Sequence, residues 1–207
     1  MAPQPESVPY RLVGSVAGTV LTYEPPVPGA PATLDVGQVA DFESTVPFVV
    51  KSQANDHPFY LGQMMTGCSV IGGSFGCDGD EEHVNVLPPA QFLPKYIFFT
   101  DPTYQTTNLV ITRTKTPSGF KDVKVDCLGV VSGWQAVGSK GDYEYTTVDL
   151  EKNGVPVNGC TNGPHAAESE NAFGLVVWGL SGAASYAYPA GGSVATINAV
   201  VVPPVPK

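Results

Sequence analysis

Proline and glycine residues occur throughout the chain, and their distribution limits the possible folds more than any other feature of the sequence. The 207 residues include 23 Gly and 20 Pro, and they interrupt every stretch that could form an amphipathic helix. The runs between them are short and rich in Val, Ile, Thr, Tyr and Phe, as in β-strands. We expect no helix beyond a short turn at 89–92. The expected strands are 10–14, 16–23, 37–44, 47–52, 58–65, 83–87, 95–100, 107–114, 121–127, 143–150, 172–179, 184–188 and 194–202.

Many short strands at this spacing predict an all-β fold, a jelly-roll-like or related β-sandwich of antiparallel strands. Asn153-Gly154 is the strongest hairpin signal, because both residues accept the positive φ of a type I′ turn. We expect a single domain over 9–202, with a subdivision near 100–106 as the alternative. The Pro-rich stretches 1–8 and 203–207 resemble linkers. With no signal peptide before them, we expect a piece of a longer protein.

The charge balance argues against two classes of partner. Ten basic and 19 acidic residues give a net charge of −9, and the basic residues are scattered. Nucleic-acid binding requires clustered Lys and Arg to replace counterions, so we expect no nucleic-acid partner. No apolar stretch reaches the roughly 18 residues of a membrane helix, so we expect no membrane insertion.

Four cysteines, Cys68, Cys77, Cys127 and Cys160, indicate an oxidising compartment, because their number is even and none forms CxxC. Three pairings are possible. We favour Cys68–Cys77, which would close a loop of Gly and Ser, together with Cys127–Cys160. The alternative is four free thiols in a cytosolic protein.

The densest charge in the chain is the acidic run Asp78, Asp80, Glu81 and Glu82. Clustered carboxylates can hold Ca²⁺, which takes six to eight oxygen ligands. The EF-hand pattern fails here, since His83 stands where the loop glycine belongs. We therefore keep calcium as the one candidate cofactor, with a solvated acidic loop as the alternative.

Aromatic residues gather in the C-terminal half. Strand alternation puts Tyr143 and Tyr145 on one face, and likewise Tyr186 and Tyr188. Together with Trp134, an exposed row of this kind would bind a sugar or a protein. The alternative is core packing, which we expect for Trp178 because its neighbours are almost wholly apolar.

A catalytic reading rests on the G-x-S-x-G match at 72–76, with Ser74 as nucleophile. A nucleophile elbow needs a strand before the serine and a helix after it. Only a short apolar stub precedes Ser74, and a loop-like sequence follows it. We therefore expect no catalytic residue, and a hydrolase is the least favoured function.

Blocks of sequence across the chain resemble the N-terminal domain family of IgG Fc-binding protein, and more closely its bacterial secreted relatives. The resemblance covers about 8–204 and corresponds to the C-terminal portion of that domain. It implies a secreted or cell-surface, non-catalytic domain of a larger adhesive protein, and a Cys127–Cys160 pair. It supplies no binding residues. The blocks are PFVVKSQ at 47–53, HPFY at 57–60, VNVLPPAQF at 84–92, YIFFTDPTY at 96–104, DC at 126–127, GW at 133–134, YE at 143–144, VDL at 148–150, CTNGPH at 160–165, FGLVVWG at 173–179 and SYAYPAG at 185–191.

The leading hypothesis is therefore an extracellular recognition or adhesion module that binds a glycoprotein or glycan through loops and a sheet face. The second is a structural subunit of an extracellular fibre or surface layer that associates with itself.

Overall fold

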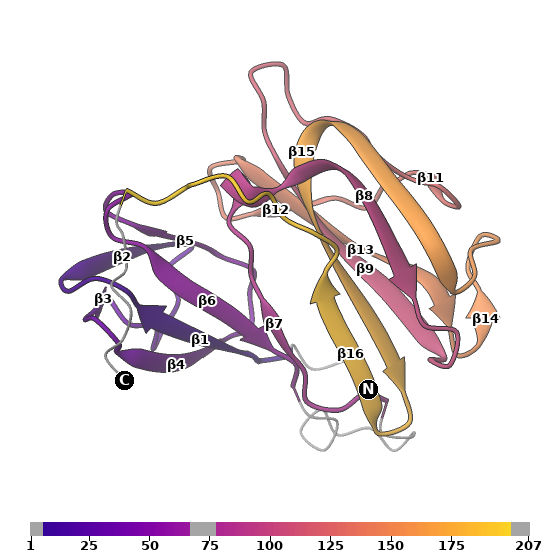
Figure 1. Ribbon diagram of the computed structural model, residues 1–207, viewed down its shortest axis with the longest axis horizontal. Coiled ribbons are helices and arrows are strands. Elements are labelled where there is room, and N and C mark those ends of the chain that lie inside the picture. Colours follow the sequence, from indigo (N-terminus) through magenta and orange to yellow (C-terminus); the bar gives the residue numbers. More distant parts are fainter. Residues whose placement is uncertain (1–5, 67–77, 200–207) are drawn as a thin grey trace.

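The computed structural model describes residues 6–66 and 78–199, and these residues form sixteen strands and one short 3₁₀ helix. Every strand pairing among them is antiparallel, which confirms the all-β, sandwich-like prediction (Figure 1). The elements are β1 (Val8–Gly14), β2 (Thr19–Glu24), β3 (Thr33–Leu34), β4 (Val39–Ser44), β5 (Val49–Ser52), β6 (Phe59–Met64), β7 (His83–Asn85), η1 (Pro89–Gln91), β8 (Leu93–Thr100), β9 (Thr106–Thr114), β10 (Val123–Val125), β11 (Gly129–Val130), β12 (Gln135–Val137), β13 (Tyr143–Lys152), β14 (Val155–Pro156), β15 (Gly163–Ser181) and β16 (Ala184–Pro189).

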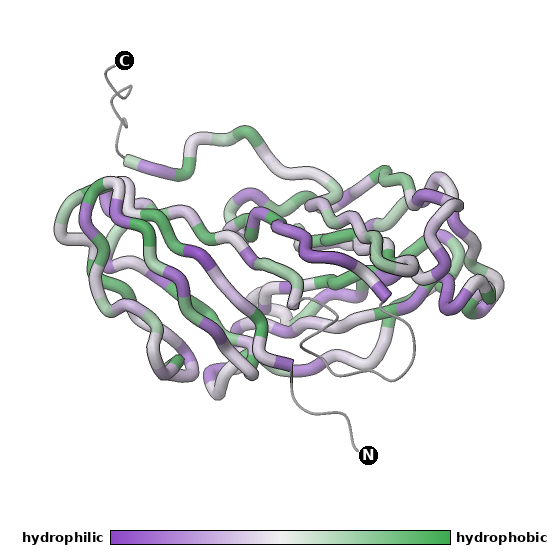
Figure 2. Tube along the Cα trace, turned by 90° about the horizontal axis from the view of Figure 1, so that it is seen from below, coloured by the Kyte–Doolittle hydropathy of each residue, from purple (hydrophilic) through white to green (hydrophobic). Residues whose placement is uncertain are grey.

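The N-terminal half consists of two small sheets. The first has the strand order β4-β1-β6-β7, and the second β3-β2-β5. Hydrophobic and hydrophilic residues alternate along these strands (Figure 2), so one face of each sheet is apolar. The two faces meet in a core whose buried members are Leu12, Leu21, Val27, Leu34 and Phe42.

The C-terminal half is one nine-stranded sheet that folds over on itself. Its centre is β15, which arches over this half (Figure 1) and is 19 residues long. The first part of β15 pairs with β8 and β10, and the second part pairs with β9 and β16. Its pairing with β8 is interrupted between Glu168 and Phe173. The two parts therefore face each other across a shared core, as in a sandwich.

This second core contains residues from both parts of the folded sheet. Phe98 and Val125 come from strands beside the first part of β15, and Leu109 and Ile111 come from β9 beside the second part. Trp178 is 8% exposed, which confirms the prediction that it is buried. The core positions hold this half together without any helix.

Turn chemistry agrees with the sequence. Asn153 and Gly154 have φ values of 51° and 72°, as a type I′ turn requires. They connect β13 to β14, which pair through Lys152 and Val155. The short turn expected near 89–92 is η1, where Pro89 occupies the start of the helix and no backbone hydrogen bond is lost.

The chain passes from the first core to the second between β7 and β8. The 100–106 segment, by contrast, joins β8 to β9, which belong to the same nine-stranded sheet. The halves are linked by Glu24, whose Oε1 accepts hydrogen bonds from the Ser139 N–H and hydroxyl at 3.0 and 2.8 Å. The single domain over 9–202 stays a prediction.

The predicted linker 1–8 overlaps β1 at Val8, and 1–5 and the 203–207 tail lie outside the described residues. Across 6–66 and 78–199, no helix is long and apolar enough to span a bilayer.

Candidate functional site

Strand β8 carries apolar side chains on both of its faces. Tyr96 and Phe98 point into the core and are 4% and 5% exposed, whereas Ile97 and Phe99 point outward and are 86% and 54% exposed. An antiparallel strand with one solvated face ordinarily alternates apolar and polar residues. Burying a Phe or Ile side chain on binding is worth roughly 1.5–3 kcal/mol. The outward pair is therefore the strongest signal of a binding surface on this half.

The neighbouring strand extends this apolar surface. In the register of β8 and β15, Ile97 lies opposite Ala166 and Phe99 opposite Pro164, and both partners are exposed. We call the four residues Ile97, Phe99, Pro164 and Ala166 the β8 face. Cross-strand neighbours of this kind have Cβ atoms roughly 4.5–5.5 Å apart, so the four side chains form one continuous patch.

Charged side chains border the β8 face. The Lys95 Nζ atom lies 3.2 Å from Glu168 Oε2, and this pair is two residues along the strands from Ile97 and Ala166. Lys124 lies opposite Glu168 on the next strand. An apolar centre with a polar rim is the arrangement of protein-binding surfaces.

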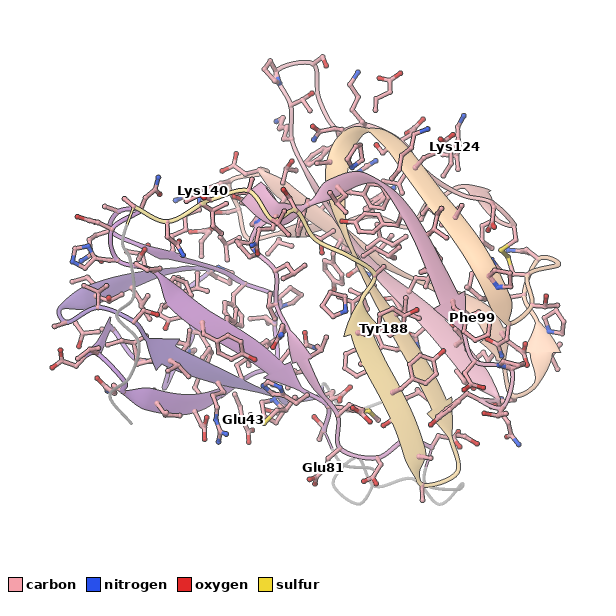
Figure 3. The ribbon with its side chains drawn as sticks, in the orientation of Figure 1. Glu43, Glu81, Phe99, Lys124, Lys140 and Tyr188 are labelled. Atoms are coloured by element: carbon pink, nitrogen blue, oxygen red, sulfur yellow. A yellow bond between two sulfur atoms is a disulfide. The ribbon has the colours of Figure 1, made fainter. Side chains whose placement is uncertain are left out.

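Tyr186 and Tyr188 of β16 form hydrogen bonds with the backbone at the end of β8. The Tyr188 hydroxyl accepts a hydrogen bond from the Phe99 N–H at 3.2 Å and donates one to the Phe99 carbonyl. The Tyr186 hydroxyl accepts one from the Asp101 N–H at 3.0 Å. Burial raises the pKa of both hydroxyls, so they remain protonated. Figure 3 shows Tyr188 beside Phe99.

The other predicted aromatic residues lie in different surroundings. Tyr143 lies beneath the Lys51 ammonium, 5.6 Å from its ring centroid, and the Tyr145 hydroxyl donates to Gln135 Oε1 at 3.1 Å. Trp134 packs against the second core, and the Arg113 guanidinium lies 3.8 Å from its ring centroid. The five aromatics thus do not form one row. Their role in binding stays a prediction.

The acidic run lies on the connection into β7. Asp80 is held there by Ser185, whose hydroxyl accepts from the Asp80 N–H at 3.0 Å and donates to its carbonyl at 2.9 Å. Asp80 Oδ1 accepts from the Glu81 N–H at 2.8 Å. Within 78–199 and 6–66, the carboxylates of Asp78, Asp80, Glu81 and Glu82 belong to no group of three convergent metal ligands. Calcium binding stays an untested prediction.

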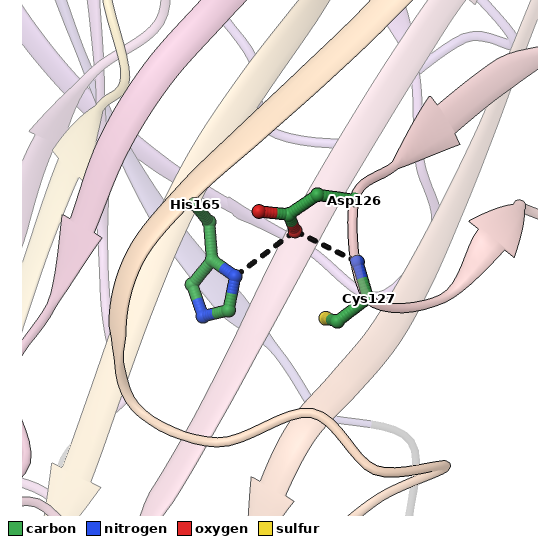
Figure 4. A group of neighbouring side chains, drawn as sticks. All are labelled: Asp126, Cys127 and His165. Atoms are coloured by element: carbon green, nitrogen blue, oxygen red, sulfur yellow. Dashed lines mark hydrogen bonds and ion pairs between the residues drawn. The ribbon is translucent and has the colours of Figure 1, made fainter.

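Cys127 and Cys160 form the expected disulfide, which links residues 33 positions apart. The predicted Cys68–Cys77 pair and Ser74 lie outside the described residues. Where the structure is described, the one group with metal-ligand spacing is Asp126, Cys127 and His165 (Figure 4). The sulfur of Cys127 is already bonded to Cys160, so this group does not offer a thiolate.

His165 instead ties two loops together beside the disulfide. Its Nδ1 lies 3.0 Å from Asp126 Oδ1, and its Nε2 lies 2.7 Å from the Thr161 carbonyl oxygen. Both partners are acceptors, so only a protonated imidazolium can donate both bonds at once. Burial opposes the charge on Asp126, but hydrogen bonds from His165, the Ala166 N–H and the Cys127 N–H lower its pKa.

Ile97 and Phe99 were not among the candidate binding residues predicted from the sequence. The signal that could have revealed them is the run Tyr96-Ile97-Phe98-Phe99. Its four consecutive apolar residues place apolar side chains on both faces of the strand. In an antiparallel sheet, such a run either lies between two layers or presents an apolar face to solvent.

A disulfide-linked all-β body with an exposed apolar face on a fixed strand edge defines a binding module. The family model of IgGFc binding protein matches residues 1–179, and the chain therefore belongs to that family. The match includes all of β8 and ends within β15. No curated protein and no solved structure matched the sequence. The family and the disulfide are those of an extracellular binding protein.

Proposed function

We propose that the chain is a non-catalytic extracellular recognition module that binds the polypeptide of a glycoprotein through the β8 face. The observation that carries this proposal is the exposure of Ile97 and Phe99 on a strand whose edge is fixed by Tyr188. A rigid anchor loses little conformational entropy on binding. Aromatic and aliphatic side chains at the centre of a patch supply most of the energy of protein interfaces.

A protein partner fits this surface better than a free sugar. Ile97, Pro164 and Ala166 offer no side-chain hydrogen-bond donor or acceptor, whereas a sugar presents a hydroxyl on most of its carbons. The polar groups at the patch lie on its rim, in Lys95 and Glu168. The family name makes the Fc portion of an antibody the first protein to test.

The test is biosensor binding of the whole chain to IgG Fc, to deglycosylated Fc and to mucin. We expect binding to Fc with or without its glycan, because the proposed contact is with polypeptide. The double variant Ile97→Ser/Phe99→Ser should weaken it at least about tenfold, which corresponds to about 1.4 kcal/mol. The matched control is Val155→Ser, since Val155 is 62% exposed on the β14 hairpin.

Unchanged affinity in the double variant, or an equal loss in the control, would refute the β8 face as the binding surface. Loss of binding on deglycosylation would identify a glycan as the partner instead. Absence of binding to all three probes would favour the second candidate function.

That second candidate is a self-associating structural subunit, and the open edge of β8 favours it. Along an edge strand, every second residue points its backbone N–H and C=O groups away from the sheet. The outward groups of Phe99 are taken by Tyr188, but those of Lys95 and Ile97 make no hydrogen bond with the described residues. Unpaired edges of this kind template strand addition. Light scattering across protein concentrations tests it, and a monomer throughout would contradict it.

A further inference from the structure

The outer face of the sheet β4-β1-β6-β7 carries a second group of oriented polar side chains, far along the chain from β8. The strand register aligns Asp41, Arg11, Gly62 and Asn85 in one row across all four strands. His83 lies two residues before Asn85 on β7 and therefore on the same face. The row therefore has side chains on three strands and a gap at Gly62.

Two side chains meet in the gap above Gly62. A Cβ atom at this position would lie 2.2 Å from His83 Nε2 and 2.9 Å from the Tyr60 hydroxyl. No real Cβ makes such contacts, so only glycine lets both groups approach the strand this closely. The rings of Tyr60 and His83 are nearly parallel, with centroids 6.2 Å apart.

A chain of hydrogen bonds fixes the direction of these groups. The Tyr60 hydroxyl donates to Asn85 Oδ1 at 2.5 Å, and its oxygen lies 3.3 Å from His83 Nε2. Because the hydroxyl proton is given to Asn85, the proton on the second bond comes from His83 Nε2. The neutral His83 ring then keeps Nδ1 as an acceptor, and Asn85 keeps both Nδ2 protons as donors. Neither atom has a hydrogen-bond partner among the described residues.

The charge of this group is balanced. Arg11 donates two parallel hydrogen bonds to Asp41, each 2.7 Å long. The pair is about half exposed, at 45% and 53%. Since Asp41 neutralises the one cation in the row and the chain carries a net charge of −9, an anionic ligand gains little here.

We infer that Arg11, Tyr60, Gly62, His83 and Asn85 form a binding site for a neutral saccharide. Adjacent sugar hydroxyls need donors and acceptors side by side, and Asn85 Nδ2 with His83 Nδ1 supplies one of each. The exposed ring of His83 offers a face for sugar C–H groups, as aromatic rings do. The saccharide site rests on the proposed function, which is the recognition of glycoproteins. It lies on a different sheet from the β8 face, and it is tested separately.

The test is an NMR titration of the ¹⁵N-labelled chain with methyl β-galactoside, and with its 6-sulfated counterpart as the anionic probe. We expect the neutral glycoside to shift the Asn85 Nδ2H₂ signals and the His83 ring signals at millimolar concentration, the affinity range of about −4 kcal/mol. Asn85→Ala should weaken binding at least about tenfold. Asn55→Ala, at an exposed loop position, is the matched control.

Tyr60→Phe gives a second variant, since it keeps the ring and removes the hydroxyl that orients both partners. Weaker binding in Asn85→Ala and Tyr60→Phe, with the control unchanged, supports the site. No shift with either probe, tighter binding of the sulfated probe, or undiminished binding in Asn85→Ala would overturn it. Saccharide binding that persists in Ile97→Ser/Phe99→Ser would separate this result from any failure at the β8 face.

Discussion

The hydroxyl of Tyr188 makes two hydrogen bonds with the backbone of Phe99. It accepts one from the Phe99 N–H at 3.2 Å and donates one to the Phe99 carbonyl oxygen. Tyr188 belongs to β16, which pairs with the second part of β15, whereas Phe99 belongs to β8, which pairs with the first part. One side chain therefore joins the two layers of the folded sheet at their open side. It also satisfies the outward backbone groups of Phe99, one position on an edge that is otherwise free to pair.

Tyr188→Phe should destabilise the protein by roughly 1–3 kcal/mol, because it leaves the Phe99 backbone groups without their partner. Urea denaturation measures the loss, and hydrogen exchange should show faster exchange at the Phe99 amide. Tyr145→Phe is the control, since in the described part of the chain its hydroxyl bonds only the exposed Gln135 side chain. An equal effect of the two substitutions would contradict the role of Tyr188.

Local signals in the sequence were enough to predict the fold class and several of its parts. Asn153-Gly154 predicted its hairpin because the turn depends on two adjacent residues only. Trp178 was predicted to be buried because its neighbours are apolar. The Cys127–Cys160 pair was favoured among three alternatives, and the structure confirms it.

Features that depend on distant strands could not be predicted in the same way. The first part of β15 was missed, because the sequence from Gly163 to Asn171 is polar and starts with Gly-Pro. Alternation placed Tyr186 and Tyr188 on one face, but only the bend of β15 decides that this face meets β8. The exposure of Ile97 has the same origin, because it depends on which layer covers β8.

The disulfide should contribute strongly to stability, because it closes a long loop. Cys127 and Cys160 are 33 positions apart, and the chain-entropy model assigns roughly 3–4 kcal/mol to a loop of this size. Cys127→Ala/Cys160→Ala should lower the free energy of unfolding in urea by about this amount. A loss below about 1 kcal/mol would show that His165 and the core already hold the two loops.

Alkaline pH should destabilise the N-terminal half through two tyrosines. Burial raises the pKa of Tyr10 to about 12, with the charge of Glu6 adding to it, and burial raises that of Tyr23 to about 12. In the unfolded chain both ionise near pH 10. Their stabilising contribution is therefore complete below about pH 10 and is lost as the pH rises through 12.

Tyrosinate absorbance measured against pH checks this expectation. The folded protein should show a group of tyrosines that ionises near pH 12, whereas in urea all should ionise near pH 10. Tyr10→Phe should remove one of the late group and reduce the loss of stability between pH 10 and 12. Identical titrations of folded and unfolded chain would contradict the burial of these hydroxyls.

Acid should weaken the contacts beside the disulfide through Asp126. Its folded pKa is lowered, because hydrogen bonds from His165 and from the Cys127 and Ala166 N–H groups outweigh its burial. The unfolded value is about 3.9, so the stabilising contribution is present above roughly pH 4 and is lost as pH falls through the lower, folded value.

Urea denaturation at pH 7 and at roughly pH 3, at constant ionic strength, measures this contribution. Asp126→Asn should be less stable at pH 7 and lose less on acidification than the parent chain. The control is Asp122→Asn, an exposed position just before β10, and equal pH dependence in the parent and in Asp126→Asn would rule out a stabilising role for the ionised Asp126.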